Sequence, residues 1–181
     1  MAGTVKAVAN DEALIGSTML PLDRPERFYV VPLTTIQEYF VVSPGYFVEL
    51  QATREHSQEP WTLEEIVQQP LITLPRDSVS FAAYSSYFRQ YGLHIEPRYE
   101  VHQEDLGFDL AGCGLGIFIG FEPALFGHPK LKILTCRSKL PVRELVLFCR
   151  KERADEATRR LMDEMAGEFV SLLHKLKRDI D

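Results

Sequence analysis

Apolar residues along this chain gather in short runs, which polar or amphipathic stretches separate. Runs rich in Val, Ile, Leu, Tyr and Phe are typical of buried strands. They cover residues 13–18, 27–33, 38–42, 71–74, 98–102, 115–119, 132–135 and 144–150. We expect Pro32 and Pro44 to close the second and third runs, because proline cannot donate a hydrogen bond to a sheet. The polar stretch 51–60 is predicted to be a loop.

Helical signals occur between these runs. Thr62 is a predicted N-cap, Glu65 completes a capping box, and Trp61 can pack against Ile66. A helix is predicted over about 79–91, because aromatic residues recur at helical spacing along one face, and Gly92 is expected to end it. That face holds Tyr84, Tyr87, Phe88 and Tyr91, which we interpret as core packing.

Two later segments also show a helical period. Leu106, Leu110 and Cys113 form one predicted face of a short helix. A long helix is predicted over about 155–178, with an acidic first turn and a basic last turn, as the helix dipole favours. Its predicted apolar side consists of Leu161, Met165, Phe169, Leu172, Leu173 and Leu176.

Strands that alternate with helices indicate an α/β fold with mainly parallel sheets. Residues 70–120 carry a continuous strand–helix–strand–helix–strand order, so we expect them to form one lobe, here lobe two. Residues 1–69 and 121–181, including the C-terminal helix, would then combine into lobe one.

Composition narrows the class of protein. The chain has 181 residues, 45% hydrophobic and 25% charged, which is typical of a soluble globular protein and excludes a disordered one. Its 20 Lys and Arg against 26 Asp and Glu give a net charge of −6, which argues against direct nucleic-acid binding by this chain. No apolar run is long enough to span a membrane, and the N-terminus shows no signal-peptide pattern.

Cysteine usage indicates a reducing compartment, and we expect a cytoplasmic protein. Cys113, Cys136 and Cys149 have no C-x-x-C spacing, so neither a zinc site nor a redox dithiol is predicted. Cys149 lies in an apolar run, where a free cysteine acts as a small hydrophobic residue.

Motifs for catalysis or cofactor binding are not found. The five histidines show no H-E-x-x-H spacing, and no G-x-S-x-G occurs. Gly112, Gly114 and Gly116 do not fit G-x-G-x-x-G and precede a predicted strand, whereas a dinucleotide loop precedes a helix. We therefore expect no cofactor and no metal.

One ordered set of motifs carries a resemblance. The sequence P-L-I-T-L-P-R-D-S over 70–78 is followed by a predicted helix, by E-V-H-Q-E-D over 100–105 and by A-G-C-G-L over 111–115. This order resembles the effector-binding domain of LysR-type transcriptional regulators. Residues 5–22 resemble an early segment of the family, in which residues 13–18 would be the strand that leads into the effector cleft. Residues 145–152 resemble the family's strand before the last helix. The resemblance covers nearly the whole chain.

The resemblance implies a two-lobed fold of the type 2 periplasmic-binding-protein class, with a small-molecule effector held between the lobes. The family's DNA-binding region and first strands would precede this chain, so DNA contact would come only through that region. The chain would be a truncated gene product or a fragment, and its first lobe would be incomplete. An exposed sheet edge invites pairing with another chain, so we expect a homo-oligomer.

Candidate effector contacts centre on the predicted helix start near Val79. Backbone N–H groups there attract a carboxylate or phosphate, Ser78 and Ser80 can add hydroxyl donors, and Arg76 can add charge. The resemblance implies further contacts at the two crossovers between the lobes. The candidate residues are Ser17, Thr18, Arg76, Asp77, Ser78, Ser80, His102, Gly120 and Phe121.

Other interpretations of these residues stay open. Asp77 or Ser78 can serve as a helix cap alone, and His102 can be a surface or capping residue. An organic acid is one candidate effector, although Asp77 works against an anion. A solute-binding protein of the periplasmic type has the same architecture. An enzyme acting on a small molecule would need an acid–base pair, which these residues do not supply.

Overall fold

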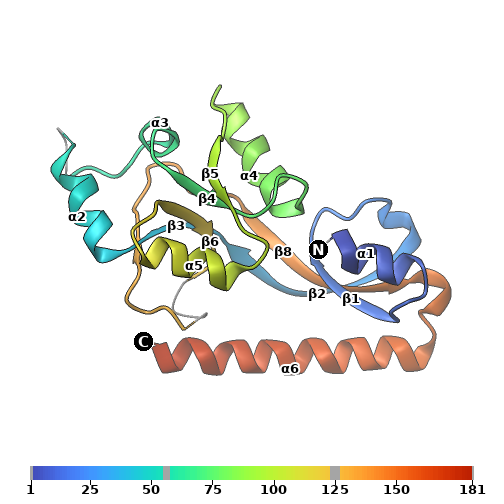
Figure 1. The fold of residues 1–181 in the computed structure, drawn as a ribbon. Coiled ribbons are helices and arrows are strands. Elements are labelled where there is room, and N and C mark those ends of the chain that lie inside the picture. Colours follow the sequence, from blue (N-terminus) through green and yellow to red (C-terminus); the bar gives the residue numbers. More distant parts are fainter. Residues whose placement is uncertain (1, 55–57, 123–126, 181) are drawn as a thin grey trace. The chain divides into compact units, whose positions relative to one another are not determined.

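A computed structural model of the chain describes residues 2–54, 58–122 and 127–180, with only the backbone for residues 2 and 176–180. Contacts divide the chain into two units (Figure 1). Unit 1 comprises residues 1–36 and 142–181, and unit 2 comprises residues 37–141.

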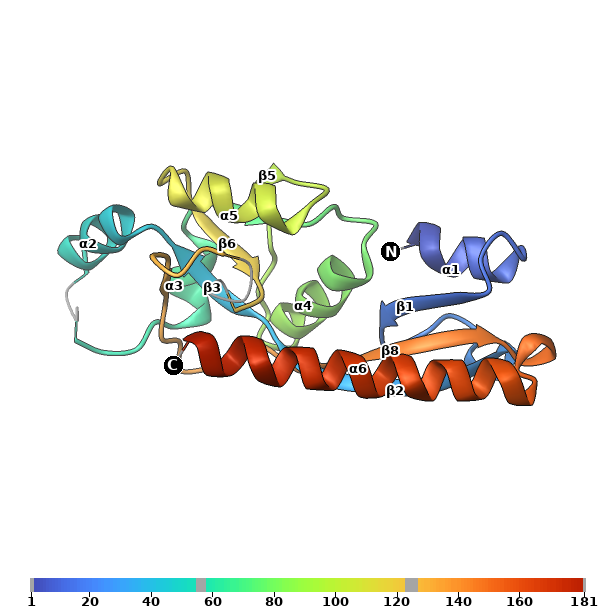
Figure 2. The same ribbon diagram turned by 90° about the horizontal axis from the view of Figure 1, so that it is seen from below.

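Unit 1 is built on a three-stranded sheet of order β1-β8-β2, in which β1 and β8 are antiparallel. Its elements are α1 (Ala2–Ala9), β1 (Ile15–Met19), η1 (Pro25–Arg27), β2 (Phe28–Gln37), β8 (Val142–Arg150), η3 (Lys151–Arg153) and α6 (Glu156–Ile180). Figure 2, seen from below, shows α6 in front of β8 and β2.

Alternate residues of β8 face opposite sides of this sheet. Phe148 packs with Val8 of α1 and with Phe28 at a ring-centroid distance of 5.3 Å. Leu147 and Cys149 pack in a separate cluster that includes Met162 of α6. The sheet therefore separates α1 from α6, and each helix buries its own apolar face.

Pro32 does not end its strand, contrary to the sequence-based expectation. β2 runs through it to Gln37. The strand order explains this, because β2 lies at an edge of the described sheet, where a missing N–H need not break a ladder.

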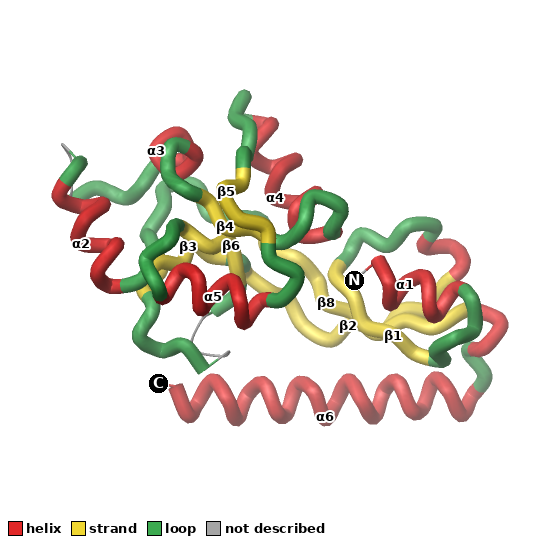
Figure 3. Tube along the Cα trace, viewed as in Figure 1, coloured by secondary structure: helices red, strands yellow, loops and turns green. Residues whose placement is uncertain are grey.

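Unit 2 is built on a five-stranded sheet of order β5-β4-β6-β3-β7. Its elements are β3 (Tyr39–Val42), α2 (Pro44–Ala52), α3 (Leu63–Val67), β4 (Leu71–Thr73), α4 (Val79–Gln90), β5 (Pro97–Glu100), α5 (Glu104–Gly112), β6 (Ile117–Gly120) and β7 (Lys132–Ile133). Figure 3 shows strands β3, β4, β5 and β6 in yellow and the helices α4 and α5 in red.

The α/β class is confirmed, but the sheets are mixed rather than mainly parallel. β4 is parallel to β5 and to β6, whereas β3 is antiparallel to β6 and to β7. Parallel pairing is found among the three strands that α4 and α5 connect, because a parallel neighbour needs a crossover.

Helices cover both faces of the five-stranded sheet. Leu71 and Ile117 pack on one face with Phe88 of α4. Ile72 and Phe118 face the other side, where Phe108 of α5 meets Phe118 at a centroid distance of 5.1 Å.

The observed units differ from the lobes expected from the sequence. Residues 37–69 and 121–141 belong to unit 2 together with 70–120. The cause is sheet pairing, since Phe40 of β3 lies opposite Ile119 of β6.

Local helix signals are confirmed where a cap defines them. Thr62 and Glu65 form the predicted capping box of α3. Gly92 follows the end of α4 with a φ of 73°, the left-handed conformation that favours glycine. Helix α2 was not predicted, although Ser43 caps it and Pro44 occupies its first turn, a known start signal.

The predicted apolar faces of α5 and α6 were wrong by part of a turn. The buried side of α5 is Gly107, Phe108 and Ala111, whereas Leu106 is exposed. In α6 Met162 is fully buried, whereas Leu161 is 44% exposed. Leu161, Met165 and Leu172 are all exposed. Both helices carry apolar residues on more than one side, so helical spacing alone did not identify the packed side.

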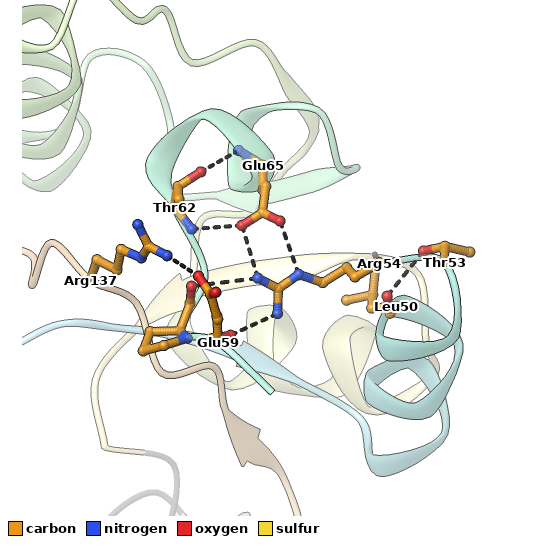
Figure 4. A network of polar contacts seen from close by, with 8 residues as sticks. Leu50, Thr53, Arg54, Glu59, Thr62, Glu65 and Arg137 are labelled. Carbon is orange, nitrogen blue, oxygen red and sulfur yellow. Dashed lines mark hydrogen bonds and ion pairs between the residues drawn. The ribbon is translucent and has the colours of Figure 1, made fainter. Parts of the chain in front are cut away.

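Arg54 follows α2, and its hydrogen bonds connect the segment before Trp61 to α3 (Figure 4). Its guanidinium donates to both carboxylate oxygens of Glu65, at 3.0 and 3.1 Å, and to the carbonyl of Glu59 at 2.9 Å. The same group stacks 4.2 Å above the Trp61 ring, and the Arg54 side chain is only 7% exposed. Arg137 forms an ion pair with the Glu59 carboxylate, and both of these side chains are exposed to solvent.

Candidate functional site

The carboxyl ends of three strands of unit 2 lie along one edge of its sheet. β4, β5 and β6 run parallel, and the antiparallel β3 begins at the same edge, where Tyr39 lies opposite Gly120. After β4 the chain continues to β5 on one side, and then returns to β6 on the other side of β4. In open α/β sheets, ligands bind outside the carboxyl ends of strands at such a reversal. This carboxyl edge is therefore the candidate site.

The start of α4 lies at this edge, directly after β4. The Ser78 hydroxyl accepts a hydrogen bond from the Phe81 N–H at 3.0 Å, so Ser78 is the N-cap. Ser80, in the first turn, is fully buried. The first N–H groups of a helix have no acceptor within it, and the helix dipole makes this end positive. An anionic group can bind there.

Tyr84, one turn after Ser80, contributes a second polar group. Its side chain is fully buried, and its hydroxyl has no hydrogen-bond partner among the described residues. Thr73 and the backbone of Leu74 lie close enough to this hydroxyl to lower its pKa, but neither has the geometry of a hydrogen bond to it. Burial raises the pKa of Tyr84, and the charges of Glu38 and Glu104 raise it further. The phenol is therefore protonated at neutral pH.

Two carboxylates approach the same edge from neighbouring elements. Glu38 precedes β3 and is 3% exposed. Glu104 is the first residue of α5, and one of its carboxylate oxygens is buried. Both charges act on Tyr84, so the surroundings of its hydroxyl include a negative field.

The predicted residues before α4 have different environments. Arg76 is turned toward β5, where it donates to Glu96 at 2.7 Å and to Glu100 at 2.8 Å. Asp77 is exposed. The cap interpretation therefore applies to Ser78, while Arg76 is held by two carboxylates.

The other predicted residues are distributed over both units. Gly120 ends β6 at the carboxyl edge, and Phe121 follows it, half-buried. His102 is exposed in the turn before α5. In unit 1, Ser17 of β1 is exposed, and Thr18 is buried with its hydroxyl 3.5 Å from the Met19 carbonyl.

Sequence analysis did not select Tyr84, Glu38, Glu104 or Thr73 for the site. Tyr84 was assigned to core packing, which is correct for its ring. Its position one turn after Ser80 was the only local signal, because side chains four residues apart share a helix face.

Over the described residues, no group of three or more His, Cys, Asp or Glu side chains is arranged to hold a metal ion. The helices of that same portion of the chain include none with the length and apolarity to cross a bilayer.

The model of the LysR substrate binding domain matches residues 1–170. The chain belongs to the LysR substrate-binding domain family. This family consists of the regulatory, effector-binding domains of transcription regulators. The match therefore favours a regulator domain over a solute-binding protein of the periplasmic type. Comparison with curated proteins gives no match.

Solved LysR structures share the fold at low sequence identity. The effector-binding domain of QuiR in complex with shikimate has a TM-score of 0.72 and 14% identity, over 93% of this chain and 77% of that chain. The cofactor-binding domain of the Cbl transcriptional regulator has a TM-score of 0.69 and 19% identity, over 99% and 76%. The CcmR regulatory domain of Synechocystis PCC6803 in complex with 2-PG has a TM-score of 0.71 and 12% identity, over 92% and 76%.

Proposed function

We propose that this LysR substrate-binding domain senses a small organic acid, which binds at the carboxyl edge of unit 2. The observation that carries the proposal is the start of α4, where an anion-attracting helix end lies at the reversal of strand order and Ser80 and Tyr84 are buried in the first two turns. Shikimate, the ligand of the similar QuiR domain, is itself a carboxylic acid.

Within this site, Ser78, Ser80, Gly120 and Phe121 are the proposed contacts from unit 2. Ser17, Thr18, Asp77 and His102 stay predicted contacts. Arg76 is less suited to an anion than a free arginine, because its Nε and Nη2 already donate to Glu100 and Glu96.

Effector binding would act by shifting the population of two arrangements of the domain. DNA contact would belong to other parts of a full regulator, and we expect no catalytic activity. The three cysteines are free, which agrees with a reducing, cytoplasmic location.

A thermal-shift screen with small carboxylic acids tests this function. An effector at 100 times its Kd adds about 2.7 kcal/mol, which raises the Tm by roughly 5–10 °C. Ser78→Ala should reduce that shift.

Ser43→Ala is the matched control, since Ser43 caps α2 as Ser78 caps α4. Each variant loses about 1 kcal/mol of capping, but only Ser78→Ala should weaken binding. Equal ligand shifts in both variants, or no shift with any acid, would contradict the proposed site.

We also infer self-association through β1. The Leu20 N–H donates to Glu144, so the alternate residues Ile15, Ser17 and Met19 direct their N–H and C=O groups away from β8. β1 is an edge of the described sheet and carries neither proline nor charge, unlike the Pro32-bearing edge β2. An antiparallel pair with β1 of a second copy would extend the sheet.

Light scattering over a range of concentrations tests this pairing. The wild type should form dimers, and Ser17→Lys should be monomeric because charges at an edge oppose pairing. A wild type that stays monomeric at high concentration would exclude it.

A further inference from the structure

We propose that the Tyr84 hydroxyl is a specificity determinant that hydrogen-bonds a neutral hydroxyl of the effector, so that the effector is a hydroxy acid. This inference rests on the proposed function, since it assumes an acid at the start of α4.

The direction of the Tyr84 side chain brings its hydroxyl to the site. Side chains in a helix tilt toward its N-terminus, and residues four apart lie one above the other. Tyr84 is therefore on the side of Ser80, and its hydroxyl reaches back toward the first turn. Its proximity to Thr73 and to the Leu74 backbone places it at the end of β4, which leads to the start of α4.

The lack of a partner for this hydroxyl needs an explanation. Buried polar groups are nearly always hydrogen-bonded, because an unpaired one loses its interaction with water. The Thr73 hydroxyl donates to the Leu74 carbonyl and the Ser78 hydroxyl accepts from the Phe81 N–H, and neither has hydrogen-bond geometry to the Tyr84 hydroxyl. Within the described residues, the Tyr84 hydroxyl is thus a buried donor at this edge without an acceptor, and a ligand can supply one.

The two ends of the proposed ligand would meet opposite electrostatic environments. The α4 N-terminus favours a carboxylate, whereas the negative field of Glu38 and Glu104 at the Tyr84 hydroxyl disfavours one. The phenol remains a donor because burial and this field keep it protonated. A carboxylate at the helix end and a neutral hydroxyl at Tyr84 satisfy both conditions, and this pair of groups defines a hydroxy acid.

The test measures dissociation constants by calorimetry for three pairs of acids that differ in one hydroxyl group. The pairs are lactate and propionate, malate and succinate, and salicylate and benzoate. The wild type should bind one hydroxy acid about tenfold more tightly than its partner, the effect of one hydrogen bond. Tyr84→Phe should remove that preference, while leaving affinity for the deoxy acid unchanged.

Tyr87→Phe is the matched control, because Tyr87 lies on the same helix and its hydroxyl is 3.3 Å from that of Tyr91. It should keep the preference. Tyr84→Phe removes an unpartnered buried hydroxyl, so it should fold with an unchanged or higher Tm.

The outcomes separate this inference from the proposed function. An acid that binds without a hydroxyl preference, or with one that survives in Tyr84→Phe, overturns the role of Tyr84 and leaves the acid site standing. If no acid binds, both the acid site and this inference fail.

Discussion

Replacing Arg54 by Met tests whether a mostly buried guanidinium holds the segment between α2 and α3. Arg54→Met keeps an unbranched apolar stem above Trp61, but removes the charge and its donors. The variant loses two charge-assisted bonds to Glu65 and those to the carbonyls of Glu59 and Pro60.

The loss of stability expected for Arg54→Met depends on how far Arg54 and Glu65 are exposed to solvent. Breaking a buried ion pair costs about 3–5 kcal/mol. Glu65 is 37% exposed and retains its bond from the Thr62 N–H, so solvent recovers part of this, and we expect about 2–3 kcal/mol. In a domain of this size the Tm should fall by roughly 4–12 °C.

Arg137→Met is the matched control for this measurement. Arg137 pairs with the side chain of Glu59, but the two side chains are 57% and 51% exposed. Such a surface pair contributes less than about 1 kcal/mol. Differential scanning calorimetry of both variants should therefore show a much larger Tm decrease for Arg54→Met, and equal decreases would refute the reasoning.

The pH dependence adds an independent measurement. Burial by itself would raise the pKa of Glu65, but the bonds from Arg54 and Thr62 outweigh it and hold the pKa below its usual range. A lowered folded-state pKa gives stability that is complete above the unfolded pKa of about 4.3, and that is lost as pH falls further. The Tm difference between wild type and Arg54→Met should be full at pH 7 and shrink below about pH 4.

Two further substitutions test the packing. Gly116→Ala should destabilise the domain, since its Cβ would lie 2.2 Å from the Pro70 carbonyl oxygen; a denaturation midpoint equal to that of wild type would contradict this close approach. Met162→Ala should cost about 2–5 kcal/mol because Met162 is fully buried, whereas Leu161→Ala, at 44% exposure, should cost under about 1 kcal/mol in urea denaturation. A larger loss of stability for Leu161→Ala than for Met162→Ala would show that α6 packs through the face that helical spacing predicted.

Signals that act within one turn or one strand were available from the sequence. The capping box of Thr62 and Glu65 satisfies backbone groups three residues away, and Gly92 ends α4 through its own φ. Ser78 was found for the same reason, since a cap and a helix end are local features. The order of these elements predicted an α/β fold, and the motifs at 70–78, 100–105 and 111–115 carried the resemblance to the LysR family.

Tertiary structure decided which neighbours those elements acquire. β2 tolerates Pro32 only because it lies at a sheet edge, and β3 turns antiparallel because it pairs with β6. The packed side of α6 depends on Val31, Leu33 and Leu147, which are far away in sequence. Hydrophobic burial is not directional along the chain, so a pattern with apolar residues on two sides of a helix does not determine which side is covered.

The candidate site divides along the same line. Sequence alone determined Ser78, Ser80 and the anion-attracting helix end, because these follow from the start of α4. Only the tertiary structure brought Glu38, Thr73 and Glu104 to the Tyr84 hydroxyl, each from a different element. The field at that hydroxyl depends on the distances between charges, and those distances exist only once the sheet and its helices have assembled.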